Sequence, residues 1–253
     1  MSFKLDNVIY KGESKEVYKE DGLAIKLFNA THPKAFVLNE ALNHARVEQY
    51  SGLNLPTLKE VAVVNNRWAL VYNFLEGKTM AELMAENPDK LDEYLAKFVD
   101  IQLEVLSKNV PLLNRTKDKF RRKLSELKDV ADDVKYELMQ RLEGMKNHTK
   151  LCHGDFNPSN VIFTENGDYY VIDWAHVTAG NASADAARTF LLFSIENKTD
   201  LADKYLKLFS QKSGIEIKYI QSWIPIVAAT QLEKGVESEK EFLLKWINVA
   251  EYQ

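Results

Sequence analysis

The sequence predicts an α+β protein with two lobes, a small antiparallel-sheet lobe with one helix and a larger, mainly α-helical lobe. Two observations lead to this fold class. Between residues 8 and 72, short apolar runs alternate with turn signals such as Asp21-Gly22, a pattern typical of antiparallel hairpins. From Thr79 onward, apolar residues recur at helical spacing instead.

The composition is that of an ordinary globular protein, with 253 residues, 45% hydrophobic and 28% charged. The formal net charge of −4 argues against sequence-independent nucleic-acid binding. The single cysteine, Cys152, excludes an intramolecular disulfide, is typical of a reducing cytosol and is expected in the core. The longest apolar run, Trp223 to Ala229, is too short to span a bilayer. We expect a cytoplasmic protein that binds neither nucleic acid nor membrane, with its oligomeric state open.

Five strands are expected in the first lobe, residues 1–76: Val8–Tyr10, Glu16–Lys19, the segment around Lys26, Val61–Val64 and Arg67–Tyr72. Counting across the Asp21-Gly22 turn places Lys26 opposite Val17. A helix is expected to begin near Thr31 and Pro33. Because Phe36 and Glu40 share one face of this helix, we expect Glu40 to point inward with Phe36.

The second lobe, residues 77–253, follows a linker at 73–77. Thr79 and Glu82 form a capping box at the start of a helix. A stripe of helical period follows at Leu91, Leu95, Phe98, Ile101 and Val105. Charged helices are expected from about 118 to 147, and further helices from about 183 to the C-terminus.

A hairpin interrupts the helices at 151–173, and Asn166-Gly167 predicts a two-residue turn within it. In that register Asn160 faces Asp173, with Cα atoms about 4.5–5.5 Å apart. The two side chains would then hold a cation together, and Mg²⁺ is suitable because it usually takes one or two carboxylates plus substrate phosphates. The alternative is that both side chains are satisfied at strand ends.

Asp155 stands five positions before Asn160, in the run His153-Gly154-Asp155. An Asp followed by an Asn and then by a second Asp is the layout that metal-assisted phosphoryl transfer from ATP requires. The sequence therefore predicts a kinase that uses ATP and Mg²⁺.

These motifs resemble the aminoglycoside phosphotransferase and choline kinase-like family, which has a protein-kinase-like fold. The resemblance rests on His153-Gly154-Asp155 with Asn160, on Asp173-Trp174, on Asp185-Ala186-Ala187-Arg188, and on the spacing of Lys26 and Glu40. It implies a nucleotide-binding lobe at 1–76 and a catalytic and acceptor-binding lobe at 77–253. The implied reaction moves the γ-phosphate of ATP to a hydroxyl of a small molecule, such as an aminoglycoside, an amino alcohol, a sugar or a vitamin.

The resemblance also implies roles for residues of the nucleotide site. Lys26 would contact the ATP phosphates and be oriented by Glu40, with Glu48 as a competing partner. Alternatively, Lys26 extends its ammonium group into water from an apolar strand. Ser14 and Val17 would complete the nucleotide site.

In the second lobe, the resemblance implies that Asp155 is the catalytic base, or orients the acceptor hydroxyl. Asn160 and Asp173 would be the Mg²⁺ ligands. His153 would brace the loop by hydrogen bonding.

Two departures limit the match. The phosphate-covering loop, Lys11–Val17, has only Gly12 where protein kinases have three glycines, which leaves open a catalytically silent nucleotide-binding module. No activation segment follows Asp173, which disfavours a protein kinase. Asp185 and Arg188 resemble a supporting segment of the family, or else form a surface ion pair.

The acceptor site is expected in the second lobe, and its chemistry is open. Aromatic residues that would suit a cationic acceptor are Trp174, Tyr219, Trp223 and Trp246, with acidic residues at Glu233, Glu237, Glu239 and Glu241. A basic cluster that would suit a phosphorylated or acidic acceptor comprises Arg115, Lys117, Lys119, Arg121, Arg122 and Lys123. For each group, core packing or a solvated helix face is the alternative.

Overall fold

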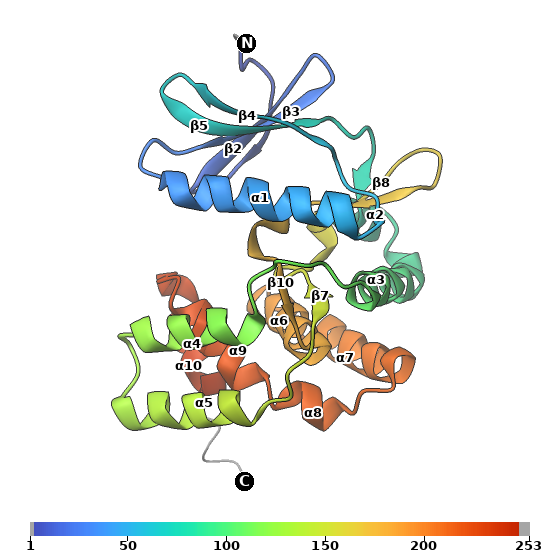
Figure 1. Ribbon diagram of the computed structural model, residues 1–253. Helices are drawn as coiled ribbons and strands as arrows, with labels where there is room; N and C mark the ends of the chain where they lie inside the picture. The colour runs from blue at the N-terminus through green and yellow to red at the C-terminus, as the bar shows by residue number, and fades with distance from the viewer. Residues whose placement is uncertain (1–2, 248–253) are drawn as a thin grey trace. The chain divides into compact units, whose positions relative to one another are not determined.

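The computed structural model describes residues 3–247 and confirms the predicted α+β class (Figure 1). Contacts divide the chain into two compact units. Unit 1 comprises the residues up to Pro88 together with Pro158–His176, and unit 2 comprises Asp89–Asn157 and the residues from Val177 onward. The hairpin after the His153-Gly154-Asp155 motif is thus grouped with the N-terminal sheet, while the functional boundary after residue 76 stays a prediction.

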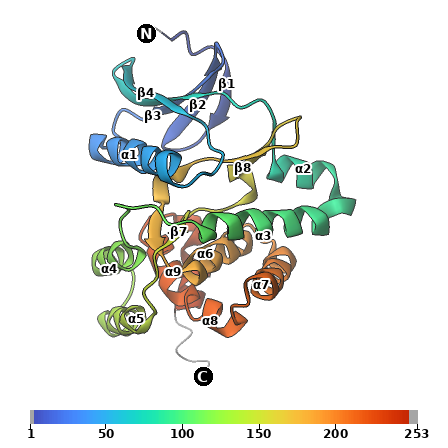
Figure 2. The same cartoon turned by 45° about the vertical axis from the view of Figure 1, so that its right-hand side comes forward.

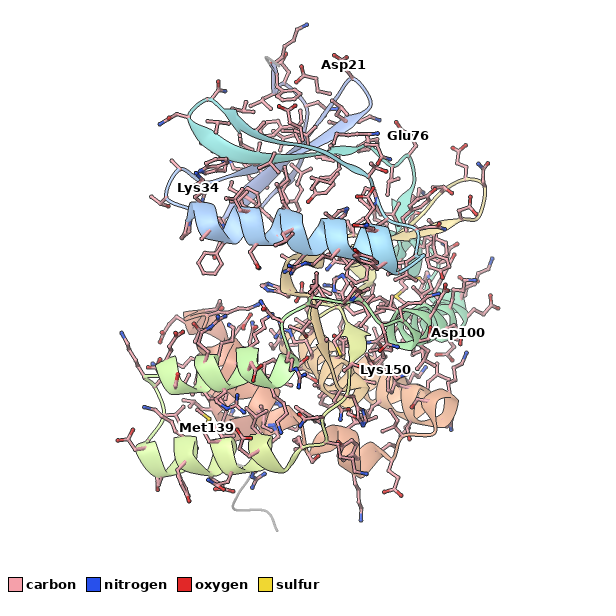
Figure 3. The ribbon with its side chains drawn as sticks, in the orientation of Figure 1. Asp21, Lys34, Glu76, Asp100, Met139 and Lys150 are labelled. Atoms are coloured by element: carbon pink, nitrogen blue, oxygen red, sulfur yellow. The ribbon has the colours of Figure 1, made fainter. Side chains whose placement is uncertain are left out.

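Unit 1 contains a five-stranded antiparallel sheet in the order β1-β2-β3-β5-β4. The strands and the connecting helix are β1 (Val8–Lys11), β2 (Lys15–Glu20), β3 (Leu23–Phe28), α1 (Lys34–Tyr50), β4 (Leu58–Val64) and β5 (Arg67–Asn73). Asp21 and Gly22 have φ of 48° and 74°, the left-handed backbone of a tight two-residue hairpin turn. This turn, marked by Asp21 in Figure 3, pairs Lys26 with Val17 as predicted.

Alternation along the strands gives this sheet two apolar faces. Ile25 and Leu27 of β3 lie on one face. Phe28 lies on the other, where it packs with Ala41 of α1. Figures 1 and 2 show α1 lying along the sheet. Because alternate strand residues point to the same side, Lys26 shares the face of Phe28 and points toward α1.

Helix α1 begins after Pro33, as predicted, but its inward face is shorter than the pattern suggested. Glu40, Ala41 and His44 are buried, whereas Phe36 is 63% exposed. The expectation that Phe36 points into the core with Glu40 was therefore wrong. Helical spacing fixes the side of a helix on which a residue lies, but not how far along the helix the covering elements extend.

A small three-stranded sheet of order β6-β8-β9 completes unit 1. Its elements, with the short helix that follows β6, are β6 (Lys78–Thr79), α2 (Met80–Glu86), β8 (Val161–Phe163) and β9 (Tyr169–Val171). The predicted capping box of Thr79 and Glu82 is present at the start of α2.

The register of the β8–β9 hairpin corrects the sequence analysis. Ile162 pairs with Tyr170, one position away from the predicted partner Val171. Thr164 N–H donates to Asp168 O at 3.0 Å, and Gly167 N–H donates to Thr164 O at 3.0 Å. The loop is therefore three residues long, and within it only Gly167 has a positive φ, of 83°. Such a loop is the next most common hairpin connection after the two-residue turn that Asn166-Gly167 suggested.

Unit 2 is mainly helical, as predicted. Its elements are α3 (Leu91–Ser107), α4 (Thr116–Glu126), α5 (Asp132–Gly144), β7 (Lys150–Cys152), β10 (Thr178–Gly180), α6 (Ala182–Ile195), α7 (Thr199–Ser213), α8 (Ile217–Gln221), α9 (Ile224–Leu232) and α10 (Glu237–Ile247). Strands β7 and β10 pair antiparallel. Among residues 3–247, no helix is long and apolar enough to cross a membrane.

An aromatic cluster forms the core around the His153-Gly154-Asp155 motif in unit 2. The ring of Phe156 lies 4.7 Å from that of Phe98 on α3, which also approaches Phe193 at 6.0 Å and Tyr205 at 6.1 Å. All four residues are buried. Phe156, one residue after Asp155, therefore anchors the motif in the core.

We expect Gly167→Ala to destabilise the protein by about 1–2 kcal/mol, because an L-residue in the left-handed region is strained. A Cβ there would meet no atom within 4 Å, so the effect would come from the backbone alone. Asn166→Ala should stay within about 0.5 kcal/mol, because Asn166 is not left-handed in this loop. Chemical denaturation measures both. A large loss in Asn166→Ala would instead indicate the two-residue turn.

Candidate active site

In unit 1, Lys26 is the centre of a buried charge cluster. Its ammonium group donates to the carboxylate of Glu40 on α1 and to Asp173 Oδ1 at 3.0 Å. The side chains of Lys26 and Glu40 are each only 9% exposed. Lys26 therefore does not extend into water. The competing residue Glu48 accepts from Leu58 N–H instead, at 3.4 Å.

Lys15 is a second cation in this cluster, with its Nζ 2.6 Å from Asp173 Oδ2. Burial alone would raise the pKa of Asp173, but the charges of Lys26 and Lys15 outweigh it and hold that pKa well below its ordinary value. Burial alone would lower the pKa of Lys26, but Asp173 and Glu40 outweigh it and raise that pKa. Burial and repulsion by Lys26 lower the pKa of Lys15. The cluster thus favours an ionised Asp173 and a charged Lys26.

Asp173 has a left-handed backbone, with φ of 62°. Strained conformations of this kind persist where the surroundings hold them, often at functional sites. Asn160 is nearly buried, and its carbonyl accepts from Ile172 N–H at 3.0 Å. The corrected hairpin register therefore places Asn160 opposite Ile172, one residue before Asp173. Direct opposition of Asn160 and Asp173 was wrong, although both residues belong to unit 1.

Asn160 and Asp173 would suit Mg²⁺ better than a metal that takes all of its ligands from protein side chains. Among residues 3–247, no group of three or more His, Cys, Asp or Glu side chains is placed to hold a metal ion. Mg²⁺ does not need such a group, because substrate phosphates and water complete its shell. One carboxylate and one amide oxygen therefore fit a metal that arrives with a nucleotide.

The loop between β1 and β2 is fixed by its own backbone. Gly12 N–H donates to Lys15 O, and Ser14 O accepts from Asn29 N–H, both at 3.0 Å. Asn29 Nδ2 also donates to the carbonyl of Glu13. Ser14 is exposed, which leaves its hydroxyl accessible. Val17 is partly buried and pairs with Lys26 across the β2–β3 ladder.

In unit 2, Asp155 lies on a loop that is held by hydrogen bonds. Asp155 N–H donates to Nδ1 of the buried His153 at 3.2 Å, which confirms that His153 braces the loop. Gly154 N–H donates to Asp185 Oδ1 at 2.7 Å. Burial raises the pKa of Asp185, and the hydrogen bond from Gly154 offsets part of that rise. The loop backbone is therefore tied to α6.

The carboxylate of Asp155 is oriented by Arg188 of α6, whose Nη2 lies 3.2 Å from Asp155 Oδ1. Arg188 Nη1 donates to Gln231 Oε1 at 2.7 Å. Arg188 is only 8% exposed, and Asp185 only 3%. These two residues therefore support the catalytic loop from the interior and do not form a surface ion pair with each other.

Further polar residues extend this support. Gln102 of α3 donates to Asp185 Oδ2 at 3.2 Å and accepts from the Tyr205 hydroxyl at 2.6 Å. The Thr189 hydroxyl donates to Phe156 O at 2.7 Å. The network is buried throughout, so each of its groups requires a partner. It holds the residues on both sides of Asp155.

The structure places the aromatic candidates for acceptor binding mostly in the core. Trp174 and Trp223 are at most 1% exposed, so they offer no open ring face. Tyr219 accepts from Asn181 Nδ2 at 2.9 Å, and Trp246 packs edge-on against Phe190. Cys152 is buried as expected, and burial raises its pKa well above the ordinary value. A thiol in this state is not a nucleophile.

The predicted acidic and basic groups are largely paired. Glu233 pairs with Lys123, Glu239 accepts from Gln231 at 2.5 Å, and Glu241 pairs with Lys245 at 3.0 Å. Arg121 pairs with Asp118 and Glu143. Lys117 donates to the carbonyls of Glu143 and Met145 at the end of α5. Arg121 and Lys117 are thus structural, and α4 and α5 pack side by side through them.

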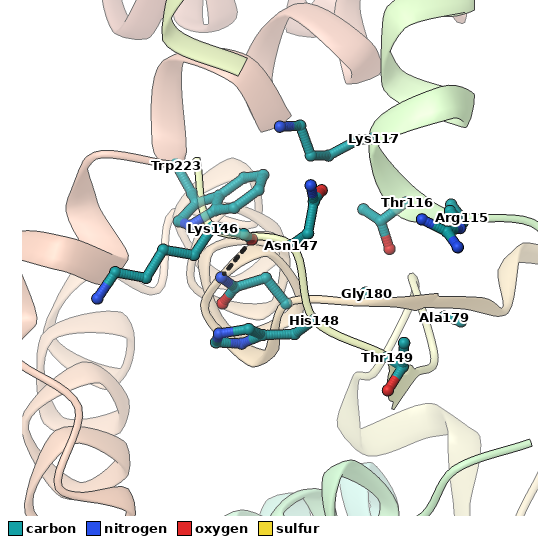
Figure 4. Close-up of a pocket in the computed structure, with 11 residues that line it drawn as sticks. Arg115, Thr116, Lys117, Lys146, Asn147, His148, Thr149, Ala179, Gly180 and Trp223 are labelled. Carbon is teal, nitrogen blue, oxygen red and sulfur yellow. Dashed lines mark hydrogen bonds between the residues drawn. The ribbon is translucent and has the colours of Figure 1, made fainter. Parts of the chain in front are cut away.

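Arg115 and Lys117 also line a recess in unit 2 with an empty volume of about 400 Å³, part of it open to solvent (Figure 4). Trp223 is among the residues around the recess although its side chain is buried, and Asn181 Nδ2 donates to Lys146 O at 3.2 Å, the dashed line in Figure 4. The ammonium group of Lys146 points away from the other labelled side chains. This recess does not include Asp155.

The sequence analysis missed two residues of this site. Lys15 was treated only as part of the loop, yet it pairs with Phe28, two positions from Lys26 on the neighbouring strand. Diagonal neighbours of this kind lie within reach of long side chains, so the hairpin register contained the signal. Gln102 had no comparable signal, because it lies four residues after Phe98 in an apolar stripe.

Two units of this kind, an antiparallel sheet with an internal Lys–Glu–Asp cluster and a helical unit with a braced Asp loop, define a kinase-type phosphotransferase. The model of the phosphotransferase enzyme family matches residues 52–216, which is 165 of the 253 residues. The chain therefore belongs to the phosphotransferase enzyme family. No curated protein sequence matches the chain significantly.

Solved structures agree with this fold. A thermostable mutant of aminoglycoside phosphotransferase APH(4)-Ia matches with a TM-score of 0.70 at 10% identity, over 96% of this chain and 92% of the other. Choline kinase LicA from Streptococcus pneumoniae matches with a TM-score of 0.67 at 16% identity, over 100% and 95%. Aminoglycoside phosphotransferase APH(2'')-Ib in its ADP-bound form gives 0.63 at 16%, over 96% and 91%. The predicted protein-kinase-like fold is confirmed.

We expect Lys26→Met to destabilise the protein by about 3–5 kcal/mol at pH 7, because it leaves the buried Glu40 without its cation and Asp173 with Lys15 alone. The loss should shrink as the pH falls toward 4. In the native protein the lowered pKa of Asp173 contributes stability above its unfolded value of about 3.9, and this contribution is lost in acid. In the variant, the uncompensated carboxylates gain from protonation.

Urea denaturation at several pH values measures this dependence. Lys59→Met, at an exposed strand position, is the matched control and should stay within about 0.5 kcal/mol. A deficit that is equal at pH 7 and pH 4 would contradict the electrostatic explanation.

Proposed function

We propose that this phosphotransferase moves the γ-phosphate of ATP, with Mg²⁺, to a hydroxyl of a small molecule. The observation that carries the proposal is the position of Asp155 on a loop braced by His153, Asp185 and Arg188. Only four residues separate Asp155 from Asn160 along the chain. The catalytic residue and the metal ligand are therefore kept close by the backbone itself.

Lys26 and Lys15 are the residues proposed to contact the nucleotide phosphates, and Glu40 orients Lys26. Their present partner, Asp173, would be released to the metal as the phosphates supply negative charge to the lysines. Ser14 and Val17 are proposed to complete the nucleotide site from the β1–β2 loop and strand β2. Asn160 and Asp173 would hold Mg²⁺, which would neutralise part of the phosphate charge.

Asp155 is proposed to accept a hydrogen bond from the acceptor hydroxyl and to receive its proton. Arg188 occupies Oδ1 of Asp155 at 3.2 Å, which fixes the plane of the carboxylate. The other oxygen, Oδ2, accepts from Asn157 Nδ2 at 3.4 Å. This geometry orients a hydroxyl for attack on phosphorus.

Related structures support a small-molecule acceptor. One structure of the aminoglycoside phosphotransferase APH(4)-Ia is a ternary complex with ADP and hygromycin B, with a TM-score of 0.69 at 12% identity. Another match is a choline kinase. Because acceptors differ this widely on one fold, the fold alone does not give the acceptor of this chain. The alternative of a silent nucleotide-binding module rests on the single glycine of the Lys11–Val17 loop.

We expect Asp155→Asn to lower kcat by about 10²–10⁴-fold, because the amide does not accept the hydroxyl proton. ATP binding should be preserved. ADP formation from Mg·ATP, measured across hydroxyl acceptors of different charge, tests this. Asp168→Asn, at an exposed position of the β8–β9 loop, is the matched control and should retain activity. Turnover that survives in Asp155→Asn would refute the assigned role.

We expect Asp173→Asn to abolish the effect of Mg²⁺ on nucleotide affinity, because it removes the carboxylate among the two proposed metal ligands. Calorimetric titration with a non-hydrolysable ATP analogue, with and without Mg²⁺, measures the effect. In the native protein Mg²⁺ should strengthen binding. An equal gain from Mg²⁺ in both proteins would place the metal elsewhere.

A further inference from the structure

Both carboxylate oxygens of Asp173 are occupied by lysines. Lys26 Nζ lies 3.0 Å from Oδ1 of Asp173, and Lys15 Nζ lies 2.6 Å from Oδ2. All three residues belong to unit 1. Because Asp173 is the proposed carboxylate ligand of Mg²⁺, a metal ion that arrives there has to compete with two ammonium groups for the same oxygens.

The two lysines differ in what else holds them. The ammonium group of Lys26 also donates to the carboxylate of Glu40. The ammonium group of Lys15 makes no hydrogen bond or ion pair within residues 3–247 other than the one to Asp173. If Asp173 turned to a metal ion, Lys26 would keep a partner and Lys15 would lose its counter-ion. Lys15 is therefore the cation that needs a new partner before Asp173 can bind a metal.

The pair of Lys15 and Asp173 lies on the accessible side of the charge cluster. Their side chains are 23% and 24% exposed, whereas those of Lys26 and Glu40 are each 9% exposed. The backbone of Lys15 is fixed, because its carbonyl accepts from Gly12 N–H at 3.0 Å. An exchange of partners at Lys15 thus requires movement only of its flexible four-carbon side chain.

Charge balance favours metal and nucleotide together over either one alone. The cluster is neutral as it stands, since Lys15 and Lys26 balance Glu40 and Asp173. A divalent ion alone would add two positive charges beside two ammonium groups. A nucleotide phosphate would instead pair with Lys15 through charge-assisted hydrogen bonds and free Oδ2 of Asp173 for the metal.

The loop before Lys15 explains why a side chain is needed for this contact. The Lys11–Val17 loop has a single glycine, Gly12, so its backbone offers few amide groups for close approach to a phosphate. Lys15 is the first residue of β2, where the loop rejoins the sheet. Its ammonium group brings three donors on a long stem, which reach where the backbone does not.

We propose that Lys15 gates the metal site: it holds Asp173 while no nucleotide is bound and releases it to Mg²⁺ when a nucleotide phosphate takes its ammonium group. Mg²⁺ then binds well only together with the nucleotide. The inference rests on the proposed function for the nucleotide and for Asp173 as a metal ligand. Lys15 is a positioning residue here, because it acts on the metal through Asp173.

The first test measures metal binding to the nucleotide-free protein. The probe is Mn²⁺, which takes the same kind of oxygen ligands as Mg²⁺ and whose free ion is counted by electron paramagnetic resonance. We expect Lys15→Met to bind Mn²⁺ at least about tenfold more tightly than the native protein, because Oδ2 of Asp173 is no longer occupied. Equal affinity in the two proteins would overturn the gate.

Three further variants make this result specific. Lys15→Gln also removes the charge and serves in case Lys15→Met fails to fold. Lys11→Met removes a lysine of the same loop whose side chain is 77% exposed, and this matched control should bind Mn²⁺ like the native protein. In the double variant Lys15→Met with Asp173→Asn, the gained binding should disappear. A gain in Lys11→Met as well, or binding that survives in the double variant, would overturn the assignment.

The second test measures how strongly metal and nucleotide favour each other. Calorimetric titration with a non-hydrolysable ATP analogue, with and without Mg²⁺, gives the factor by which Mg²⁺ strengthens nucleotide binding. Direct binding of Mg²⁺ to the analogue is common to both proteins and cancels in their comparison. We expect this factor to be at least about tenfold smaller in Lys15→Met than in the native protein, by the same linkage that strengthens Mn²⁺ binding. An equal factor would contradict the gate.

Turnover separates the gate from the proposed function. If loss of Lys15 creates the Mn²⁺ site and turnover of an acceptor depends on Asp155, both hold. If the Mn²⁺ site appears but no acceptor is phosphorylated, the gate stands and the proposed phosphotransfer fails. If turnover depends on Asp155 while both Lys15 variants bind Mn²⁺ like the native protein, the proposed function stands and the gate fails.

Discussion

The buried pairing of Lys26 with Glu40 and Asp173 is the interaction on which the organisation of unit 1 depends. It joins strand β3, helix α1 and Asp173, which lies two residues after the end of β9. Burying one of these charges alone would cost several kcal/mol, so each requires the others. The same dependence explains why a lysine is tolerated in an otherwise apolar strand.

In unit 2, hydrogen bonds hold the loop that carries Asp155. The role proposed for Asp155 requires that an acceptor can reach its carboxylate, so the loop cannot be stabilised by covering it. Instead, the backbone beside it is tied to Asp185, and Asp185 is tied through Gln102 to Tyr205. The reactive carboxylate thus lies at the edge of a network whose other members are buried. Rigidity at such a site favours catalysis, because the hydroxyl is aligned before reaction.

Much of the fold follows from local signals, and the exceptions have physical causes. The Asp21-Gly22 turn gave the correct register because both residues adopt the left-handed backbone that a two-residue turn needs. Asn166-Gly167 is an equally strong sequence signal for a two-residue turn, yet only Gly167 is left-handed. The loop therefore has one extra residue, which shifts every pair in the hairpin.

Burial was the harder quantity to predict. Trp174 and Trp223 lie in the core although their sequence positions allowed a binding role, and Phe36 is exposed although its spacing suggested the core. The periodicity of apolar residues shows which side of a helix they lie on, whereas their burial depends on elements distant in the sequence that pack against that side. For the same reason the sequence alone did not assign Gln102 to the site, whereas the predicted β2–β3 register already placed Lys15 near Lys26.

Most of the polar side chains that support the loop of Asp155 are buried. Asp185, Arg188 and Gln102 are buried and mutually dependent, so substitutions there would destabilise the loop as well as the reaction. Loss of one member would leave a buried polar group of another without its partner, as removal of Asp185 would for Gln102.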